Sequence, residues 1–203
     1  MAYFFCLQIT TAQCYEITYH YNWILVLQYF SNSYIYWVDC CRTPKIERSR
    51  LDGAEREKLF SNRKKIPNGL ALDESGGKLY WAGTDVNEYG IIGVITLSDL
   101  SSKVIFQRTG YLPYGLDVFE GYAYWTDQKK EAVLRINNNN SVTEEKIIFP
   151  DLNKPNGMKI RARREKRPGR KQPLYISFYG TFFTHYMKRS VVGSSIFQTL
   201  KYA

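Results

Sequence analysis

The sequence is poor in cysteine and histidine and has no long apolar run. It has two histidines and four cysteines, Cys6, Cys14, Cys40 and Cys41, which form neither a C-x-x-C pair nor a regular extracellular framework. Their disulfide pairing and the redox compartment stay open. The longest apolar run, WILVL at 23–27, is far shorter than the roughly 20 residues that span a bilayer. The sequence therefore predicts no transmembrane segment, no metal site and no cofactor.

The N-terminus and the charge distribution exclude little more. Residues 1–14, MAYFFCLQITTAQC, lack the basic n-region of a secretory signal peptide. The net charge of +9 is concentrated in RARREKRPGRK at 161–171, which holds seven Lys and Arg and one acid. A nucleic-acid-binding protein usually spreads its basic residues over a face and interleaves them with aromatics. Since the middle of the chain does not follow that pattern, the sequence does not favour a nucleic-acid partner.

Aromatic residues, by contrast, are abundant. The chain has 17 Tyr, 11 Phe and 4 Trp, and these residues suit the pleated, half-buried surface of a strand. The composition therefore predicts a mostly β protein.

Two sequence markers recur in step along the chain. YIYWVD, KLYWAG and YAYWTD place Trp37, Trp81 and Trp125 at intervals of 44 residues. PNGLALD, PYGLDVF and PNGMKI begin at Pro67, Pro113 and Pro155, at intervals of 46 and 42. Each period reads as four short strands separated by turns, such as GLALD, KLYWAG, GIIGVITL and KVIFQR. Four strands in about 40 to 45 residues are typical of a β-propeller blade.

These motifs resemble the YWTD repeats, also called class B repeats, of the low-density lipoprotein receptor family, over about Tyr34 to Ile160. The resemblance implies a six-bladed propeller, of which this length supplies about three blades. We expect an all-β fold with a partial ring of four-stranded blades. The expected division is a non-repeat segment at 1–33, propeller repeats at 34–160, a basic exit linker at 161–173 and a non-repeat segment at 174–203. The chain is predicted to be a truncated fragment; the alternative is an intact, divergent protein whose ends supply further strands.

The repeated aromatic motif has a structural interpretation. Adjacent residues of a strand point to opposite faces, so each period directs one large aromatic toward each neighbouring blade. An Asp at the strand end can accept backbone N–H bonds and fix the next blade. The second copy has Ala82-Gly83 in place of Thr-Asp, with Asp85 two residues further on, and no copy has a catalytic partner. The motif residues are Tyr36, Trp37, Asp39, Tyr80, Trp81, Tyr124, Trp125 and Asp127.

The second marker predicts a tight turn that leads into each blade, because Pro followed closely by Gly suits such a turn. The residues concerned are Pro67, Gly69, Pro113, Gly115, Pro155 and Gly157. Because the resemblance implies that partners bind at a propeller face, these turns are also candidates for ligand contact. Tyr114 is the strongest of them, since large amphipathic side chains are enriched at binding hot spots.

The resemblance implies a non-enzymatic, extracellular binding module, at the cell surface or secreted, with protein ligands or lipoproteins as partners. Its parent would act in endocytosis or as a signalling co-receptor. The basic run, represented by Arg161, Arg163 and Arg164, is either a solvated linker or a contact for acidic class A modules or glycans, or a nuclear-localisation signal. Asn139 lies in an N-glycosylation sequon, Asn139-Asn140-Ser141.

Two alternatives stay open. One is a matrix-binding propeller of the nidogen kind. The other is a propeller hydrolase with a central metal, for which Asp73 and Asp117 occupy corresponding positions and Lys159 the third. A repeated Asp is more simply structural.

Overall fold

The computed structural model describes residues 14–19, 22–28, 34–39, 43–137, 146–150, 152, 155–162, 174–179 and 198–202. These residues form strands and no helix, so no helix among them is long and apolar enough to span a membrane. The strands are β1 (Cys14–Tyr19), β2 (Asn22–Gln28), β3 (Tyr34–Asp39), β4 (Lys45–Arg50), β5 (Glu57–Ser61), β6 (Lys65–Asp73), β7 (Lys78–Asp85), β8 (Tyr89–Thr96), β9 (Ser102–Thr109), β10 (Pro113–Phe119), β11 (Tyr122–Asp127), β12 (Ala132–Asn137), β13 (Lys146–Phe149), β14 (Gly157–Ala162), β15 (Leu174–Tyr179) and β16 (Gln198–Tyr202).

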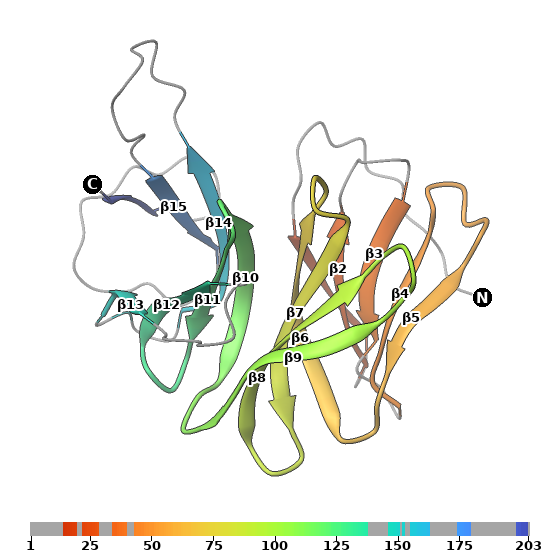
Figure 1. Ribbon diagram of the computed structural model, residues 1–203, viewed down its shortest axis with the longest axis horizontal. Coiled ribbons are helices and arrows are strands. Elements are labelled where there is room, and N and C mark those ends of the chain that lie inside the picture. The colour runs from red at the N-terminus through yellow and green to blue at the C-terminus, as the bar shows by residue number, and fades with distance from the viewer. Residues whose placement is uncertain are drawn as a thin grey trace.

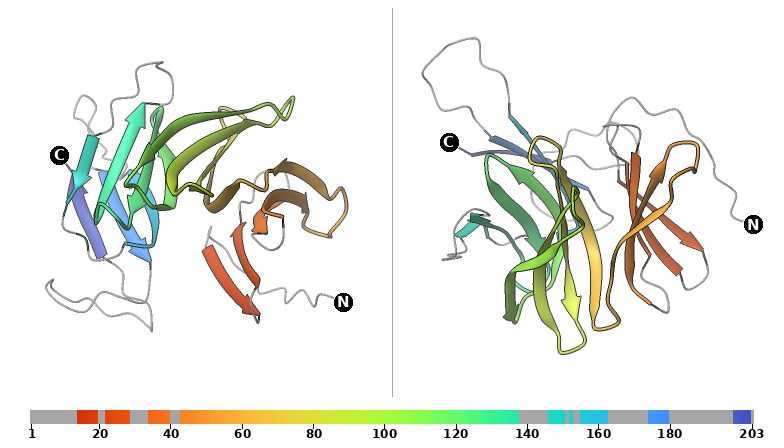
Figure 2. Two further views of the ribbon diagram at one scale, coloured as in Figure 1. Left: turned by 90° about the horizontal axis from the view of Figure 1, so that it is seen from below. Right: turned by 45° about the vertical axis from the view of Figure 1, so that its right-hand side comes forward.

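The strands form four antiparallel sheets that follow one another in chain order (Figures 1 and 2). Sheet 1 has the order β1-β2-β3-β4-β5, sheet 2 β6-β7-β8-β9, sheet 3 β10-β11-β12-β13 and sheet 4 β14-β15-β16. Strand β10 lies between β6 and β14, so the first strands of sheets 2, 3 and 4 are neighbours. This arrangement of consecutive sheets around their first strands is that of a partial β-propeller, and the predicted fold class is confirmed.

The strands predicted within the repeats are also confirmed. GLALD lies in β6, KLYWAG in β7, most of GIIGVITL in β8 and KVIFQR in β9. The next period gives β10 to β13 in the same order. Sheets 2 and 3 each contain the four strands of one period in chain order. Each of these two periods therefore forms one blade.

The prediction of a tight turn at Pro-x-Gly is wrong for the first two copies. Pro67-Asn68-Gly69 lies inside β6 and Pro113-Tyr114-Gly115 inside β10. In both strands the register shifts next to this tripeptide, between Pro67 and Gly69 and between Pro113 and Leu116. The pairing leaves out Asn68 in β6 and Tyr114 and Gly115 in β10, while both prolines keep a partner in the ladder, as at a β-bulge.

Both ends of the chain add strands to the sheets. Strands β1 and β2 extend sheet 1 beyond β3, and β15 and β16 pair with β14 to make sheet 4. The sequence places the start of a linker at Arg161, but Arg161 and Ala162 complete β14 and pair with Tyr175 and Leu174. Residues 163–173 therefore join two paired strands of one sheet.

The core lies between the sheets and depends on alternation along each strand. Trp81 faces sheet 1, in a cluster with Tyr36, Val38 and Ile46. The adjacent Tyr80 faces sheet 3, in a second cluster that contains Trp125. The prediction that each Tyr-Trp pair sends one aromatic to each neighbouring blade is thus confirmed for the second copy. Burial of one such ring contributes about 2–3 kcal/mol.

Candidate functional site

The carboxylate of Asp127 is a hub of hydrogen bonds at one end of sheet 3. Its oxygens accept the backbone N–H of Leu112, which belongs to the segment between sheets 2 and 3, at 3.0 and 3.1 Å. They also accept the N–H groups of Lys129 and Lys130 in the turn after β11, and the indole Nε1 of Trp125 at 3.3 Å. Since Asp127 is fully buried, this carboxylate holds the blade boundary and is not exposed to a substrate.

Thr126 links the first strands of two adjacent sheets. Its Oγ1 accepts the N–H of Gly115 at 2.8 Å and donates to the carbonyl of Asn156, just before β14. Next to it, the Gln128 amide donates to the Asn156 side chain at 2.6 Å. The Thr-Asp half of the motif therefore joins sheets 3 and 4 as well as sheets 2 and 3.

The second copy of the motif makes only part of these contacts. Asp85 caps its own turn by accepting the N–H groups of Asn87 and Tyr89, both at 2.9 Å, and it also accepts Gln107 Nε2. Among the described residues no carboxylate reaches Trp81, and its buried Nε1 has no hydrogen-bond partner there. Asp85 thus caps its turn but accepts no hydrogen bond from the indole of Trp81.

The first copy lies on a more solvated face. Trp37 is half-buried, and the guanidinium of Arg56 lies 5.3 Å from its ring centroid. Asp39 pairs with Lys45 at 3.5 Å, and Glu47 accepts both Lys45 and Arg56. Burial by itself raises the pKa of Glu47, but the hydrogen bonds from Arg56 and Lys45 outweigh it and hold that pKa below its usual value.

The glycines of the second marker allow adjacent strands to approach closely. A Cβ added to Gly69 would lie 2.1 Å from the carbonyl oxygen of Tyr114, and one added to Gly115 would lie 2.4 Å from that of Asn156. The backbone of the next sheet's Pro-x-Gly segment thus packs directly against each glycine. Their role is inter-sheet contact, because neither has the positive φ that would demand glycine for a turn.

An ion pair between a buried carboxylate and a partly exposed lysine joins sheets 3 and 4. The carboxylate of Asp117 in β10 accepts Lys159 Nζ at 3.1 Å and the N–H of Ile160 at 2.7 Å, both from β14. Burial raises the pKa of Asp117 above its ordinary value, while the charge of Lys159 acts in the opposite direction. The hydrolase interpretation would need this carboxylate to be free, but it serves the sheet boundary. Asp73 in turn accepts Ser75 and Gly76 of its own turn.

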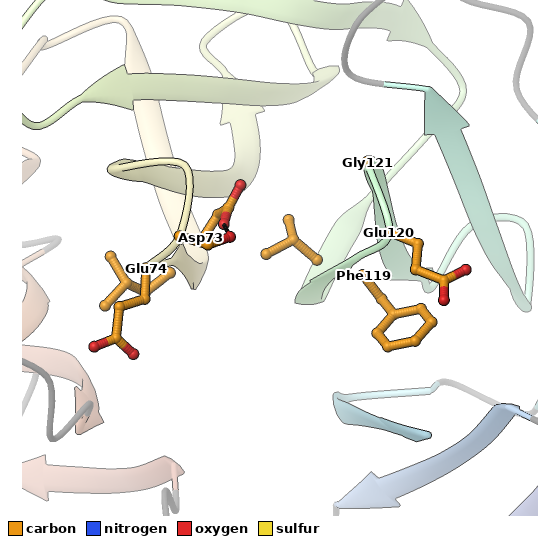
Figure 3. Close-up of a pocket in the computed structure, with 8 residues that line it drawn as sticks. Asp73, Glu74, Phe119, Glu120 and Gly121 are labelled. Carbon is orange, nitrogen blue, oxygen red and sulfur yellow. Dashed lines mark hydrogen bonds between the residues drawn. The ribbon is translucent and has the colours of Figure 1, made fainter. Parts of the chain in front are cut away.

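An open pocket of about 370 Å³ lies between the β6–β7 and β10–β11 hairpins. Figure 3 shows Asp73 and Glu74 on one side of the pocket and Phe119, Glu120 and Gly121 on the other. The pocket is also lined by Leu72, Ser75 and Val118. Glu120 and Gly121 form a two-residue turn with φ of 47° and 76°, the conformation that matches the twist of a hairpin. Three carboxylates and one aromatic ring therefore surround an opening at the hairpin end of sheets 2 and 3.

The structure places the other predicted residues as follows. Tyr114 is half-buried inside β10, and its carbonyl covers Gly69. Pro155 and Gly157 lie just before and at the start of β14, and Arg161 lies near its end. Cys14 begins β1. Asn139, Arg163, Arg164, Cys6, Cys40 and Cys41 lie outside the described residues. In the described part of the chain, no group of three His, Cys, Asp or Glu side chains could hold a metal ion.

Sequence reasoning missed several partners of the motif. The ring of Phe60 in β5 lies 5.1 Å from Trp81, and that of Phe106 in β9 lies 4.9 Å from Trp125. Both Phe residues pair with the strand that follows the motif strand, opposite Ile46 and Ile92. The recurring Phe in KLF, KVIFQR and KIIF was the available signal. Sheets 1 and 2, and likewise sheets 2 and 3, therefore meet through a phenylalanine and a tryptophan.

Sheet 4 follows the same register without the motif. Met158 pairs with Phe178, as Leu116 pairs with Trp125, so Phe178 stands at the position of the motif tryptophan. By the same comparison, Lys159 stands at the position of Asp117. Substitution of Phe for Trp hid this strand from a search for Tyr-Trp.

Comparisons with known proteins agree with this geometry. Residues 33–74 match the low-density lipoprotein receptor repeat class B. The vitellogenin receptor Yl of Drosophila melanogaster is 27% identical over 99 residues, 49% of this chain and 5% of that receptor. Low-density lipoprotein receptor-related protein 5 of Homo sapiens is 33% identical over 95 residues, 47% of this chain and 6% of that protein. The chain thus spans a small part of the relatives that it matches.

The fold is shared with one solved structure, and a second is similar in part. A prolyl endopeptidase structure aligns with a TM-score of 0.50 at 8% identity, over 77% of this chain and 27% of that one. At this identity the likeness concerns the fold alone. A nidogen–laminin complex aligns with a TM-score of 0.49 at 26% identity, over 58% of this chain and 43% of that one.

Proposed function

Because residues 33–74 match the class B repeat of the low-density lipoprotein receptor and the chain is similar to a receptor-related protein of that kind, we propose that it is a non-enzymatic, extracellular module that binds protein ligands or lipoproteins for a receptor-like protein. The observation that carries the proposal is the use of the motif carboxylate. Asp127 is buried and engaged with the N–H groups of Leu112, Lys129 and Lys130. Because its carboxylate is already hydrogen-bonded, the motif holds blades together. Ligand binding is therefore left to the ends of the sheets.

The hairpin end of sheets 2 and 3 is the proposed contact surface. Its pocket has the size of a ligand site, but it is open and bordered by the carboxylates of Asp73, Glu74 and Glu120. Phe119 supplies an apolar wall. Carboxylates beside an aromatic ring suit the ammonium or guanidinium of a protein ligand better than an apolar small molecule. Tyr114 and the basic residues Arg161, Arg163 and Arg164 are further proposed contacts, the basic residues for acidic class A modules or glycans.

The test immobilises the full chain and measures the binding of vitellogenin, low-density lipoprotein and laminin by surface plasmon resonance. Reversal of a pocket charge by Glu120→Lys should weaken a bound ligand at least tenfold. Glu131→Lys is the matched control, since Glu131 is also exposed and has a φ of 49°, close to that of Glu120. Equal losses in the two variants would contradict the pocket assignment, and no binding to any of the three probes would contradict the choice of ligand class.

The non-enzymatic part of the proposal has a separate test. A hydrolase with a central metal would be stabilised by calcium and would cleave a chromogenic ester or lactone. We expect neither a calcium-dependent shift in the melting temperature nor turnover above that of heat-denatured protein. A micromolar calcium site together with turnover would favour the hydrolase alternative.

A further inference from the structure

The two ends of sheets 2 and 3 carry opposite charge. The end opposite to the pocket, which we call the basic end, consists of residues 62–64, 86–88, 108–112 and 128–131. Its charged side chains are all exposed, and five of the seven are cationic. They are Arg63, Lys64, Arg108, Lys129 and Lys130, with the carboxylates Glu88 and Glu131. The strand connections of the hairpin end, by contrast, contain three carboxylates and no cation: Glu74, Asp99 and Glu120.

The segments of the basic end adjoin one another. The backbone N–H of Val86 donates to the carbonyl of Lys64 at 3.0 Å, which joins the β5–β6 and β7–β8 connections. The Nζ of Lys129 lies 3.3 Å from Oε2 of Glu88, which brings the β11–β12 turn to the same place. The cations therefore belong to one continuous surface that runs from the end of sheet 1 to sheet 3.

The aspartates closest to this surface direct their carboxylates away from solvent. Asp127 is fully buried and accepts the N–H groups of Leu112 and Lys129, which also joins the segment before β10 to the turn after β11. Asp85 is half-buried and accepts the N–H of Tyr89 in its own turn. A ligand in solvent therefore meets mainly the cations of the basic end.

Four of these cations are available to an anion. Neither Arg63 nor Lys64 has a side-chain hydrogen bond or ion pair in the part of the chain that the structure describes. Lys129 pairs with Glu88, but the two side chains are 43% and 84% exposed, and such a solvated pair is weak. Lys130 places its Nζ 4.4 Å from the ring centroid of Tyr111, which restrains the position of that cation.

We propose that the basic end binds a sulfated polysaccharide of the heparan sulfate class. Sulfate groups would contact Arg63 and Lys64 on one side of the β7–β8 turn and Lys129 and Lys130 on the other. Ammonium and guanidinium groups form strong, charge-assisted hydrogen bonds to anionic oxygens. A linear polyanion that neutralises a row of such cations also releases bound counterions, so it binds without needing a pocket.

The surface suits a polysaccharide better than an acidic protein or a single-stranded nucleic acid. Protein interfaces have an apolar centre rich in aromatic residues, but Val86 is the one exposed large apolar side chain among the residues of the basic end. Single-stranded nucleic acids stack their bases on exposed aromatic rings. The aromatic ring of this end belongs to Tyr111, which is buried and contacts Lys130.

The test measures the affinity of the full chain for immobilised heparin by surface plasmon resonance at several NaCl concentrations. Arg63→Gln with Lys64→Gln should weaken binding at least fivefold. It should also reduce the slope of log affinity against log salt by about two, because each neutralised charge contributes about one to that slope. Lys129→Gln with Lys130→Gln should have the same effect. Binding that neither double variant weakens would overturn the proposal.

The matched control is Lys58→Gln with Lys103→Gln, which removes two exposed lysines of β5 and β9 outside the basic end. This control should leave the slope unchanged, and melting temperatures check that every variant is folded. Losses in the control equal to those of the first double variant would show that net charge alone governs binding, and the proposal would fail.

Two further measurements separate this surface from other binding sites. Poly-glutamate that binds as tightly as heparin would identify an acidic protein as the partner and overturn the proposal. Glu120→Lys, which tests the pocket, should not weaken heparin binding, because the pocket lies at the other end of the sheets. A loss of heparin binding in that variant would place the polysaccharide at the hairpin end and contradict the assignment to the basic end.

Discussion

The indole Nε1 of Trp125 donates a hydrogen bond to the Oδ2 of Asp127, two residues along the same strand, at 3.3 Å. The equivalent Trp81 is just as deeply buried, and its Nε1 has no hydrogen-bond partner in the part of the chain that the structure describes. The two copies therefore differ by one buried hydrogen bond, although both tryptophans lie against a phenylalanine of the preceding sheet.

Substitution of the two tryptophans by phenylalanine should have unequal effects. Trp125→Phe removes a donor that Asp127 accepts, whereas Trp81→Phe removes a donor that has no acceptor. We expect Trp125→Phe to reduce the free energy of unfolding by about 1–2 kcal/mol more than Trp81→Phe. Urea denaturation followed by circular dichroism measures the difference, and equal losses would contradict the role of the indole bond.

The close approach at Gly69 predicts a large effect of one methyl group. Gly69→Ala would bring a Cβ to 2.1 Å from the Tyr114 carbonyl oxygen, which is backbone and cannot move alone. We expect a loss of about 3 kcal/mol or more, or failure to fold. Gly77→Ala is the control: Gly77 has open space around it and a φ of 59°, so that variant should lose only about 1 kcal/mol. A smaller loss for Gly69→Ala than for Gly77→Ala would refute the contact.

The raised pKa of Asp117 predicts a pH dependence with a defined sign. Its folded pKa lies above the ordinary value of 3.8, so its contribution to stability is complete below that value and declines as pH rises through the folded pKa. The destabilisation caused by Asp117→Asn should therefore become smaller as pH rises from 4 to 8. Melting temperatures of the two proteins across this range measure the trend.

Asp99 provides a control of opposite sign. The Ser101 backbone N–H lowers the pKa of Asp99 below 3.8, so its contribution is present above that value and is lost as pH falls through the folded pKa. The cost of Asp99→Asn should thus grow as pH rises from 3 to 5. If the cost of both substitutions changes with pH in the same direction, burial does not determine the pKa of Asp117.

The pairing of the terminal strands leads to a prediction about the association of the repeat segment when it is expressed alone. Residues 34–160 lack β1 and β2 of sheet 1 and β15 and β16 of sheet 4. The exposed edges of β3 and β14 present unpaired backbone groups and invite association. We expect this segment to be poorly soluble or to associate, and the full chain to associate less at equal concentration. Light scattering makes the comparison, and a monodisperse monomer of 34–160 with a cooperative melt would contradict it.

Local sequence was sufficient for the elements of the repeat. The 44-residue spacing of Trp37, Trp81 and Trp125 located the motif strands. The alternation of Tyr80 and Trp81 gave their opposite directions. These inferences worked because strand period and side-chain alternation are properties of a few adjacent residues. The Pro-x-Gly bulge was missed because proline followed by glycine also suits a turn, and only the pairing of β6 with β7 distinguishes the two.

The blade period, the β class and the Tyr-Trp pair of each repeat can be read from the amino-acid sequence alone. Tertiary structure decided the rest: Asp117 bonds to Lys159 from 42 residues away, and Phe106 meets Trp125 across a sheet boundary. It also decided that β14, β15 and β16 form a fourth sheet although no Tyr-Trp marks it. The repeat specifies which side chains each strand carries. Which residues those side chains contact depends on which strands are brought together when the sheets associate.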